Sequence, residues 1–172
     1  AKGNKINFDK MKGIVGIFGK SYSGKSSVVD SILYTIFNSI SKNARKNYNI
    51  INQNKNWGRG AVEIEIGEDT YFIERKSEKY EKRLAGVTTE EAKTEVSFRK
   101  TNADKEEKSL NGESRTDTDQ EIRKIFGVIE DFLLTSMSSQ FGFLNFIGEG
   151  STRRKEILAK YLDLEIFDKK FK

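Results

Sequence analysis

The chain has 172 residues, of which 33% are charged, and its net charge is +5, so it has the size of one domain with its own core and a solvated surface. It contains neither Cys nor His, which excludes disulfides and thiol chemistry and leaves oxygen atoms as the ligands for any metal, a preference that favours magnesium over zinc. No apolar run approaches the roughly 20 residues of a membrane span and the polar, basic start is unlike a signal peptide, so we expect a cytoplasmic protein without a membrane partner.

The first predicted elements are a strand and a helix on either side of a glycine-bearing loop. Residues 13–18 form a continuous apolar run, which is typical of a strand buried on both faces of a sheet. A shorter apolar segment, residues 6–8, precedes it. Beyond the loop, apolar side chains from Val28 to Ile40 follow the helical period, which predicts a helix over residues 25 to about 40 with one buried face.

The middle of the chain predicts a basic loop followed by strands. Residues 41–60 carry five basic side chains and no acidic one, and the sequence leaves open whether this basic stretch binds DNA. Residues 62–66 alternate between apolar and acidic side chains, as in a half-buried strand. Residues 71–76 are the predicted returning strand, Val96 and Phe98 mark another, and the polar segment after residue 101 is expected to be exposed.

Three helices are predicted in the last third of the chain. Thr118 and Glu121 fit a capping box that begins the first of them. The second is predicted over residues 130 to about 137. The third begins at Ser151 or Thr152 and continues towards the last residue, since the chain has no Pro to interrupt it.

The loop after the first predicted strand matches the phosphate-binding pattern G-x-x-x-x-G-K-[ST] at every fixed position: Gly19, Lys20, Ser21, Tyr22, Ser23, Gly24, Lys25 and Ser26. Gly19 and Gly24 allow backbone conformations that turn successive N–H groups towards phosphates. Lys25 would place a charge between the β- and γ-phosphates, and Ser26 offers a hydroxyl to magnesium. A chance match is expected in about one chain in a hundred of this length. The strand and helix that flank the loop favour a P-loop that binds ATP with magnesium.

A P-loop site is normally completed by a carboxylate that follows four apolar residues and orders magnesium and water. Residues 128–131 are too short for this motif and follow Gly127, so Glu130 and Asp131 are interpreted as charges at a helix start. Residues 162–165 alternate and belong to the last predicted helix. The sequence therefore predicts half of an ATPase site, inactive by itself.

The order of these features resembles the N-terminal ATPase lobe of the SbcC family, SMC-like, ABC-type ATPases that partner an SbcD-type nuclease in DNA break repair. The resemblance begins with G-I-V-G-I-F, G-K-S-Y-S-G-K-S-S and V-V-D-S-I-L-Y-T-I-F. It continues through L-N-G, I-F-G-V, S-S-Q-F-G-F-L-N-F-I and T-R-R-K-E-I-L. It covers essentially the whole chain and is strongest to the large subunit of phage recombination nucleases, which would place the protein in the host cytoplasm.

The resemblance implies an α/β P-loop NTPase fold, the N-terminal lobe of an ABC-type ATPase with a mixed sheet. Residues 1–161 would be this lobe, and residues 162–172 the start of a coiled coil. Ser27 would join the P-loop residues in holding ATP. Gln140 falls where the family's Q-loop glutamine contacts magnesium and the attacking water; the alternative is a plain loop amide. Arg153 and Arg154 fall at the root of the coiled coil, or else lie on a solvated helix face.

Several departures from the family are visible. Ser21 and Tyr22 stand where the family often has Asn-Gly, which matters little because binding needs the backbone N–H. The L-S-G-G signature, the carboxylate motif and the C-X-X-C zinc hook are absent. In the family these follow the first arm of the coiled coil, so their absence implies a truncated N-terminal lobe. The family's first strand is likewise expected to precede Ala1.

The resemblance implies that ATP joins two heads, with the signature motif of one facing the P-loop of the other. The expected partners are the C-terminal half of the head, a second copy of the subunit, an SbcD-like nuclease and double-stranded DNA. A purely structural SMC head that organises DNA is the first alternative. A P-loop small-molecule kinase would leave residues 138–160 unexplained, and a transporter ATPase is least favoured because nothing indicates a membrane partner.

Overall fold

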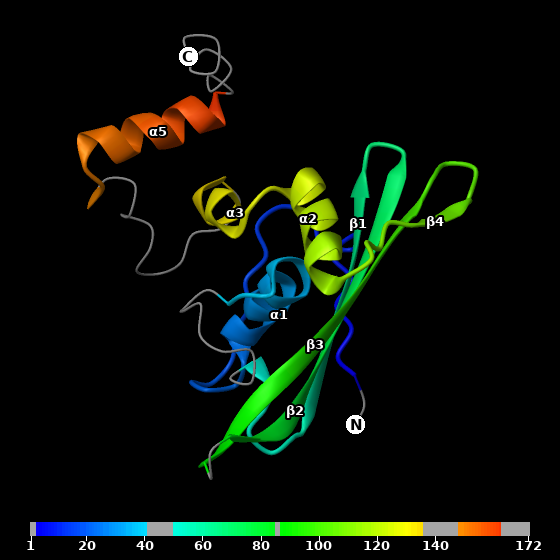
Figure 1. Cartoon of the computed structure of the whole chain (residues 1–172). Helices are drawn as coiled ribbons and strands as arrows, with labels where there is room; N and C mark the ends of the chain where they lie inside the picture. Colours follow the sequence, from blue (N-terminus) through cyan, green and yellow to red (C-terminus); the bar gives the residue numbers. More distant parts are fainter. Residues whose placement is uncertain (1–2, 41–49, 85–86, 136–147, 163–172) are drawn as a thin grey trace, which may run out of the picture. The chain divides into compact units, whose positions relative to one another are not determined.

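The computed structural model describes residues 3–40, 50–84, 87–135 and 148–162 and divides the chain into two compact units (Figure 1). The first unit, residues 1–109, contains α1 (Lys25–Phe37), β1 (Trp57–Ile66), β2 (Asp69–Leu84), β3 (Val87–Thr101) and β4 (Glu107–Ser109). The second unit, residues 110–172, contains α2 (Arg115–Phe126), α3 (Ile129–Thr135) and α5 (Ser151–Tyr161). Among the helices of these described residues, none is long and apolar enough to cross a membrane.

The sheet of the first unit is an antiparallel meander in the order β1-β2-β3-β4. Its central register aligns Val62 with Ile73 and Ile73 with Phe98, so apolar side chains share one face. The chain turns from β1 to β2 at Gly67, whose φ of 64° favours a glycine. The strands predicted at residues 62–66, 71–76 and 96–98 are therefore confirmed.

The strands are longer than the sequence predicts. Trp57 and Arg59 belong to β1, so the loop predicted over residues 41–60 is wrong at its end. β4 lies in the polar segment that was expected only to be exposed. Alternation of apolar and polar residues fades after Lys76, and the extension is instead held by the backbone ladder and by cross-strand polar pairs.

The core of the first unit lies between α1 and the sheet. α1 packs on β1 and β2, and Leu33 and Ile36 of its last turn are buried, as are Ile73 and Phe98. The helix ends at Phe37 rather than near residue 40, because Asn38 adopts the left-handed conformation (φ 57°) and its N–H bonds to the Tyr34 carbonyl. The predicted helix with one buried face is otherwise confirmed.

At Gly60, β1 lies close against Thr35 of α1, which gives a stability prediction. A Cβ at Gly60 would lie 2.1 Å from the Thr35 hydroxyl oxygen, so we expect Gly60→Ala to destabilise the unit by about 1–3 kcal/mol. Gly58→Ala, two residues earlier in the same strand, is the matched control, because its Cβ would meet Ile51 at an ordinary 3.7 Å. Chemical denaturation of both variants measures the difference; equal stabilities would contradict the close packing.

The apolar segment at residues 13–18 corrects the sequence prediction. It is not a strand, and Ile14 and Phe18 are 104% and 93% exposed rather than buried on two faces. An apolar run becomes a strand only where a neighbouring strand supplies a hydrogen-bonded ladder, and the four described strands pair only with one another. The four described strands pair antiparallel with their neighbours. The sheet in the described residues is therefore antiparallel, whereas a mixed sheet was expected. The segment at residues 6–8 is likewise outside regular structure.

The second unit begins with a helix whose cap differs from the prediction. The capping box of α2 is formed by Ser114 and Asp117 rather than by Thr118 and Glu121. Thr118 lies one turn inside the helix, where its hydroxyl donates to the Ser114 carbonyl (3.1 Å) and accepts from the Gly112 N–H (3.0 Å). Its spacing to an acidic residue imitated a cap, but its hydroxyl is already bonded within the helix.

The remaining helices agree with the sequence where they are described. α3 begins one residue before its predicted start at residue 130, and α5 begins at Ser151 as predicted. α5 extends to Tyr161. The coiled-coil prediction concerns residues 162–172, all but the first of which lie outside the described residues, so it stays a prediction.

Candidate nucleotide-binding site

The predicted P-loop is a compact turn that leads directly into α1. The Ser23 N–H donates to the Lys20 carbonyl at 3.2 Å, Tyr22 has a positive φ of 62°, and Gly24 is the helix N-cap with a φ of 86°. A non-glycine residue with a positive φ is uncommon and costs roughly 1–2 kcal/mol. Tyr22 is fully exposed, so its side chain leaves the inner surface of the loop to backbone atoms.

The first glycine of the motif is required by close packing within the loop. A Cβ at Gly19 would lie 2.7 Å from the Ser23 hydroxyl oxygen, which is closer than such atoms normally approach. Gly24 is instead required by its backbone, since its left-handed conformation is costly for any residue with a side chain. The two fixed glycines therefore have different physical reasons, one steric and one conformational.

The Lys25 ammonium lies across this loop. Its Nζ donates to the Gly19 carbonyl at 2.8 Å and to the Lys20 carbonyl at 2.7 Å. These are exposed contacts to a polar backbone, so the ammonium can exchange them for phosphate oxygens without losing core packing. The positive charge thus lies beside the backbone at the start of the loop, close to Gly19 and Lys20.

The N-terminus of α1 is suited to an anion. Gly24 provides no side-chain cap, and the first turn of the helix contains no acidic residue. The start of α2 differs, because Ser114 caps it and Asp117 lies in its first turn. Amide groups and the helix dipole at α1 can therefore be directed at a phosphate rather than at the protein's own carboxylate.

The residues around this loop fit a nucleotide with magnesium. Ser26 and Ser27 follow Gly24 in the first turn, and both are exposed. The described residues contain no group of three or more acidic or other metal-ligating side chains. The Ser26 hydroxyl is an oxygen ligand that this loop would offer to magnesium. Ser21 is also exposed on the loop, in agreement with a role for backbone amides at that position.

The other predicted site residues belong to the second unit or lie outside the described residues. Gln140 lies outside the described residues, so its role at magnesium stays a prediction. Arg153 donates from Nη1 to Glu156 Oε2 at 3.0 Å within α5, and Arg154 is exposed. These contacts suit a solvated helix face and give no indication of a ligand. Glu130 is exposed in the first turn of α3, as expected for a charge at a helix start.

One cation of the basic stretch is already paired. Arg59 forms a two-point contact with Glu74, through Nε to Oε1 at 2.8 Å and Nη2 to Oε2 at 2.7 Å. The hydrogen bond to Arg59 lowers the pKa of the Glu74 carboxyl, and the same bond raises the pKa of the guanidinium. Arg59 therefore forms an ion pair between β1 and β2. Residues 41–49 lie outside the described residues.

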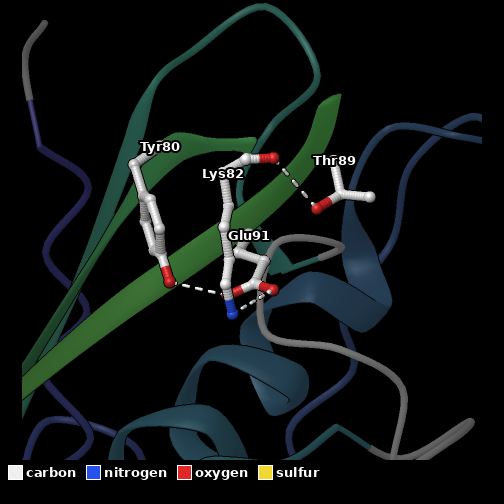
Figure 2. A network of polar contacts seen from close by, with 4 residues as sticks. All are labelled: Tyr80, Lys82, Thr89 and Glu91. Carbon is white, nitrogen blue, oxygen red and sulfur yellow. Dashed lines mark hydrogen bonds and ion pairs between the residues drawn. The ribbon is translucent and has the colours of Figure 1, made fainter. Parts of the chain in front are cut away.

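β2 and β3 continue past β1 as a two-stranded arm, which we define as residues 79–84 and 87–92 (Figure 1). Figure 2 shows one polar network on this arm. Glu91 accepts from the Tyr80 hydroxyl at 2.6 Å and from the Lys82 ammonium at 3.3 Å. Thr89 donates to the Lys82 carbonyl at 3.4 Å. The bond to Glu91 raises the pKa of the Tyr80 hydroxyl. These contacts were missed from the sequence because each joins residues 7 to 11 positions apart.

Comparisons with known proteins identify the family of the chain. A family model described as an AAA domain matches residues 2–172. The chain belongs to this family. A Clostridium acetobutylicum protein named as the SbcC component of the nuclease SbcCD is 26% identical over 93% of the chain, and a Sulfolobus acidocaldarius protein named DNA double-strand break repair Rad50 ATPase is 37% identical over 34% of it. The predicted resemblance to SbcC-like ATPases, and with it the α/β P-loop ATPase fold, is confirmed.

A viral protein is also similar to the chain. It is described as uncharacterized protein R555 of Acanthamoeba polyphaga mimivirus, and it is 31% identical over 94% of the chain. The chain spans only 12% of that protein and 13% of the Clostridium one. The relatives of the chain include proteins named as an SbcCD subunit and as a Rad50 ATPase, so family membership supports ATP hydrolysis in general.

Proposed function

We propose that the chain is the ATP-binding half of an ATPase head in a nuclease complex similar to SbcC and SbcD, which processes DNA ends in repair, recombination or replication. ATP with Mg²⁺ joins two heads, and hydrolysis reopens them and gates access of double-stranded DNA to the nuclease. The complex acts in the cytoplasm, that of the host if a phage encodes it. The observation that carries the proposal is a P-loop motif at a helix N-terminus that has neither a side-chain cap nor an acidic residue in its first turn. It occurs in a chain of which 93% aligns with the SbcC relative.

Each P-loop residue has a role in this proposal. Backbone amides from Gly19 to Ser27 surround the phosphates, and Lys25 neutralises charge between the last two of them. The Ser26 hydroxyl and the Gln140 amide oxygen hold Mg²⁺. The metal supplies neutralisation of the charge that develops on the γ-phosphate. The protein's contribution is to hold the phosphates in one orientation and to exclude bulk water from them.

The exposed apolar segment at residues 13–18 supports a missing half of the head. Ile14 and Phe18 are almost wholly exposed, although an isolated apolar run gains stability only when it is covered. We propose that the C-terminal half of the head pairs with this segment and supplies the signature motif and the catalytic carboxylates. A structural SMC-type head would need the same completion, so this observation does not separate the two.

The alternatives are separated by what the complete protein assembles with. We expect the full-length protein to dimerise when ATP and Mg²⁺ are added, as measured by light scattering, and to retain an SbcD-like nuclease through purification. Degradation of linear double-stranded DNA by that complex should depend on ATP. Dimerisation without a nuclease would favour the structural SMC head. ATP-dependent phosphorylation of a small molecule by a monomer would favour a kinase.

Gln140 gives the next prediction, because an amide can ligate magnesium through its oxygen and orient water through its nitrogen. Both contacts matter most as the γ-phosphate leaves, so we expect Gln140→Ala to lower turnover at least about tenfold, or ~1.4 kcal/mol of transition-state stabilisation, with little change in ATP affinity. ATPase kinetics and ATP titration of the complete head, with its nuclease present, measure the two effects.

Gln140→Glu is the sharper companion variant. It preserves the shape and a metal-facing oxygen but adds a negative charge near the γ-phosphate, so turnover should again fall. If both variants turn over ATP as the wild type does, Gln140 is a loop amide and the Q-loop alignment is misplaced. If ATP affinity falls as much as turnover, Gln140 contributes to ground-state binding instead.

A further inference from the structure

The helix that carries the P-loop is held chiefly at its opposite end. Four consecutive residues of its last turns, Leu33 to Ile36, are buried, whereas its first eight residues are exposed or half-buried. A helix of 13 residues is a stiff body about 18 Å long from its first to its last Cα atom. Whatever fixes the last turn against the sheet therefore also fixes where the first turn and the P-loop lie.

A buried arginine makes the principal polar contact at that fixed end. Arg75, on β2, is 0% exposed. Its Nε donates to the Thr35 carbonyl at 3.1 Å and its Nη2 donates to the Ile36 carbonyl at 3.3 Å. These are among the last carbonyls of α1, where the negative end of the helix dipole favours a cation. The planar guanidinium addresses both carbonyls at once, which fixes direction as well as distance.

A second buried contact lies beside it. The Tyr34 hydroxyl shares a hydrogen bond of 2.7 Å with Ser77, and Ser77 shares another of 2.7 Å with Thr94 on β3. All three residues are buried, and burial raises the pKa of the Tyr34 hydroxyl. The last turn of α1 is thus joined to β2, and through Ser77 to β3, by buried hydrogen bonds. Gly60 of β1 lies against the same turn of α1, since a Cβ at this position would collide with Thr35.

We propose that Arg75 is a positioning residue for the nucleotide site: it sets the direction of α1 and thereby the place of Lys25 and the P-loop amides. The proposal rests on the proposed function of that loop. Arg75 would act by positioning and not by catalysis, since its hydrogen bonds go to the end of the helix opposite the P-loop. Its guanidinium and the anion site occupy opposite ends of one helix, so changing Arg75 should alter phosphate binding without touching a phosphate.

The test compares Arg75→Met with a core substitution away from the last turn of α1. Both are made in the full-length protein and titrated with ATP and Mg²⁺ at a temperature where circular dichroism shows each variant to be folded. We expect Arg75→Met to raise the Kd for ATP about tenfold. Ile122→Val, at a buried site on α2 in the second unit, should lower the melting temperature yet leave the Kd within about twofold of the wild type.

Rescue by a conservative residue separates positioning from general stability. Arg75→Lys retains the charge and one donor group but cannot match the fork geometry, so its Kd should fall between those of the wild type and Arg75→Met. If Arg75→Met does not fold, Arg75→Lys and Ser77→Ala, which removes the hydroxyl between Tyr34 and Thr94, take its place and should each weaken ATP binding about threefold.

Two results would overturn the inference. One is an Arg75 variant that is folded, destabilised and still binds ATP with the wild-type Kd. The other is an Ile122→Val protein whose ATP affinity falls in step with its melting temperature, since Arg75 would then act only through stability. Lys25→Ala, measured in parallel, distinguishes these from a failure of the P-loop itself: if that variant also keeps the wild-type Kd, the proposed function fails and not only the role of Arg75.

Discussion

Replacing Lys25 by Ala is expected to weaken ATP binding at least about 100-fold while leaving the fold intact. Charge-assisted hydrogen bonds contribute about 1.5–3 kcal/mol each, and Lys25 would make them to two phosphates, which corresponds to a loss of this size. Its present bonds, to the Gly19 and Lys20 carbonyls, are exposed. These bonds give the ammonium no part in the core, so its loss should leave the fold intact.

Lys20→Ala is the matched control for this substitution. Lys20 is an exposed lysine of the same loop, at a position where the motif accepts any residue. Its removal lowers the net charge by the same amount, so any loss of affinity common to both variants reports general electrostatics. Circular dichroism checks the fold and titration with ATP and Mg²⁺ measures the Kd. Equal ATP affinities for the wild type and Lys25→Ala would refute the P-loop assignment.

The parts of the fold predicted best are those set by short-range pattern. The start of α1 was predicted to the residue, because the fixed glycines of the motif and the helical period both lie within one continuous segment. The three strands were located by alternation. Their lengths were underestimated, because the outer parts of β2 and β3 are charged on both faces and depend on pairing with each other, as Tyr80 and Lys82 do with Glu91.

The errors have a common physical origin in contacts between distant segments. Residues 13–18 look like a buried strand, yet a strand also needs a partner ladder, which an apolar run does not specify. Thr118 looks like a cap because spacing alone does not show which hydroxyl already has a partner. Arg75 could not be singled out from the sequence, because it is one of several charged residues in β2. Only its hydrogen bonds to carbonyls 39 and 40 positions away reveal its role at the end of α1.

The isolated chain is expected to hydrolyse ATP far more slowly than the ~1–100 s⁻¹ typical of kinases. Its sequence lacks a run of four apolar residues that ends in a carboxylate pair, and the described residues hold no group of three or more acidic side chains arranged for a metal ion. Lys25 and the α1 amides bind phosphates, but binding the ground state and the transition state equally leaves the chemical step unaccelerated. The missing contribution is a positioned base for the attacking water.

Adding the C-terminal half of the head should restore turnover, because it would bring the carboxylates to the phosphates held by this P-loop. The measurement is phosphate release by the 172-residue chain alone, by the added half alone, and by the two together. A mixture made with Lys25→Ala is the control, since activity that survives this substitution comes from another site. If the chain alone reaches the kinase range, it contains a complete site and the division of the ATPase between two halves is wrong; a slow chain whose activity returns only in the mixture requires residues from both halves at one γ-phosphate.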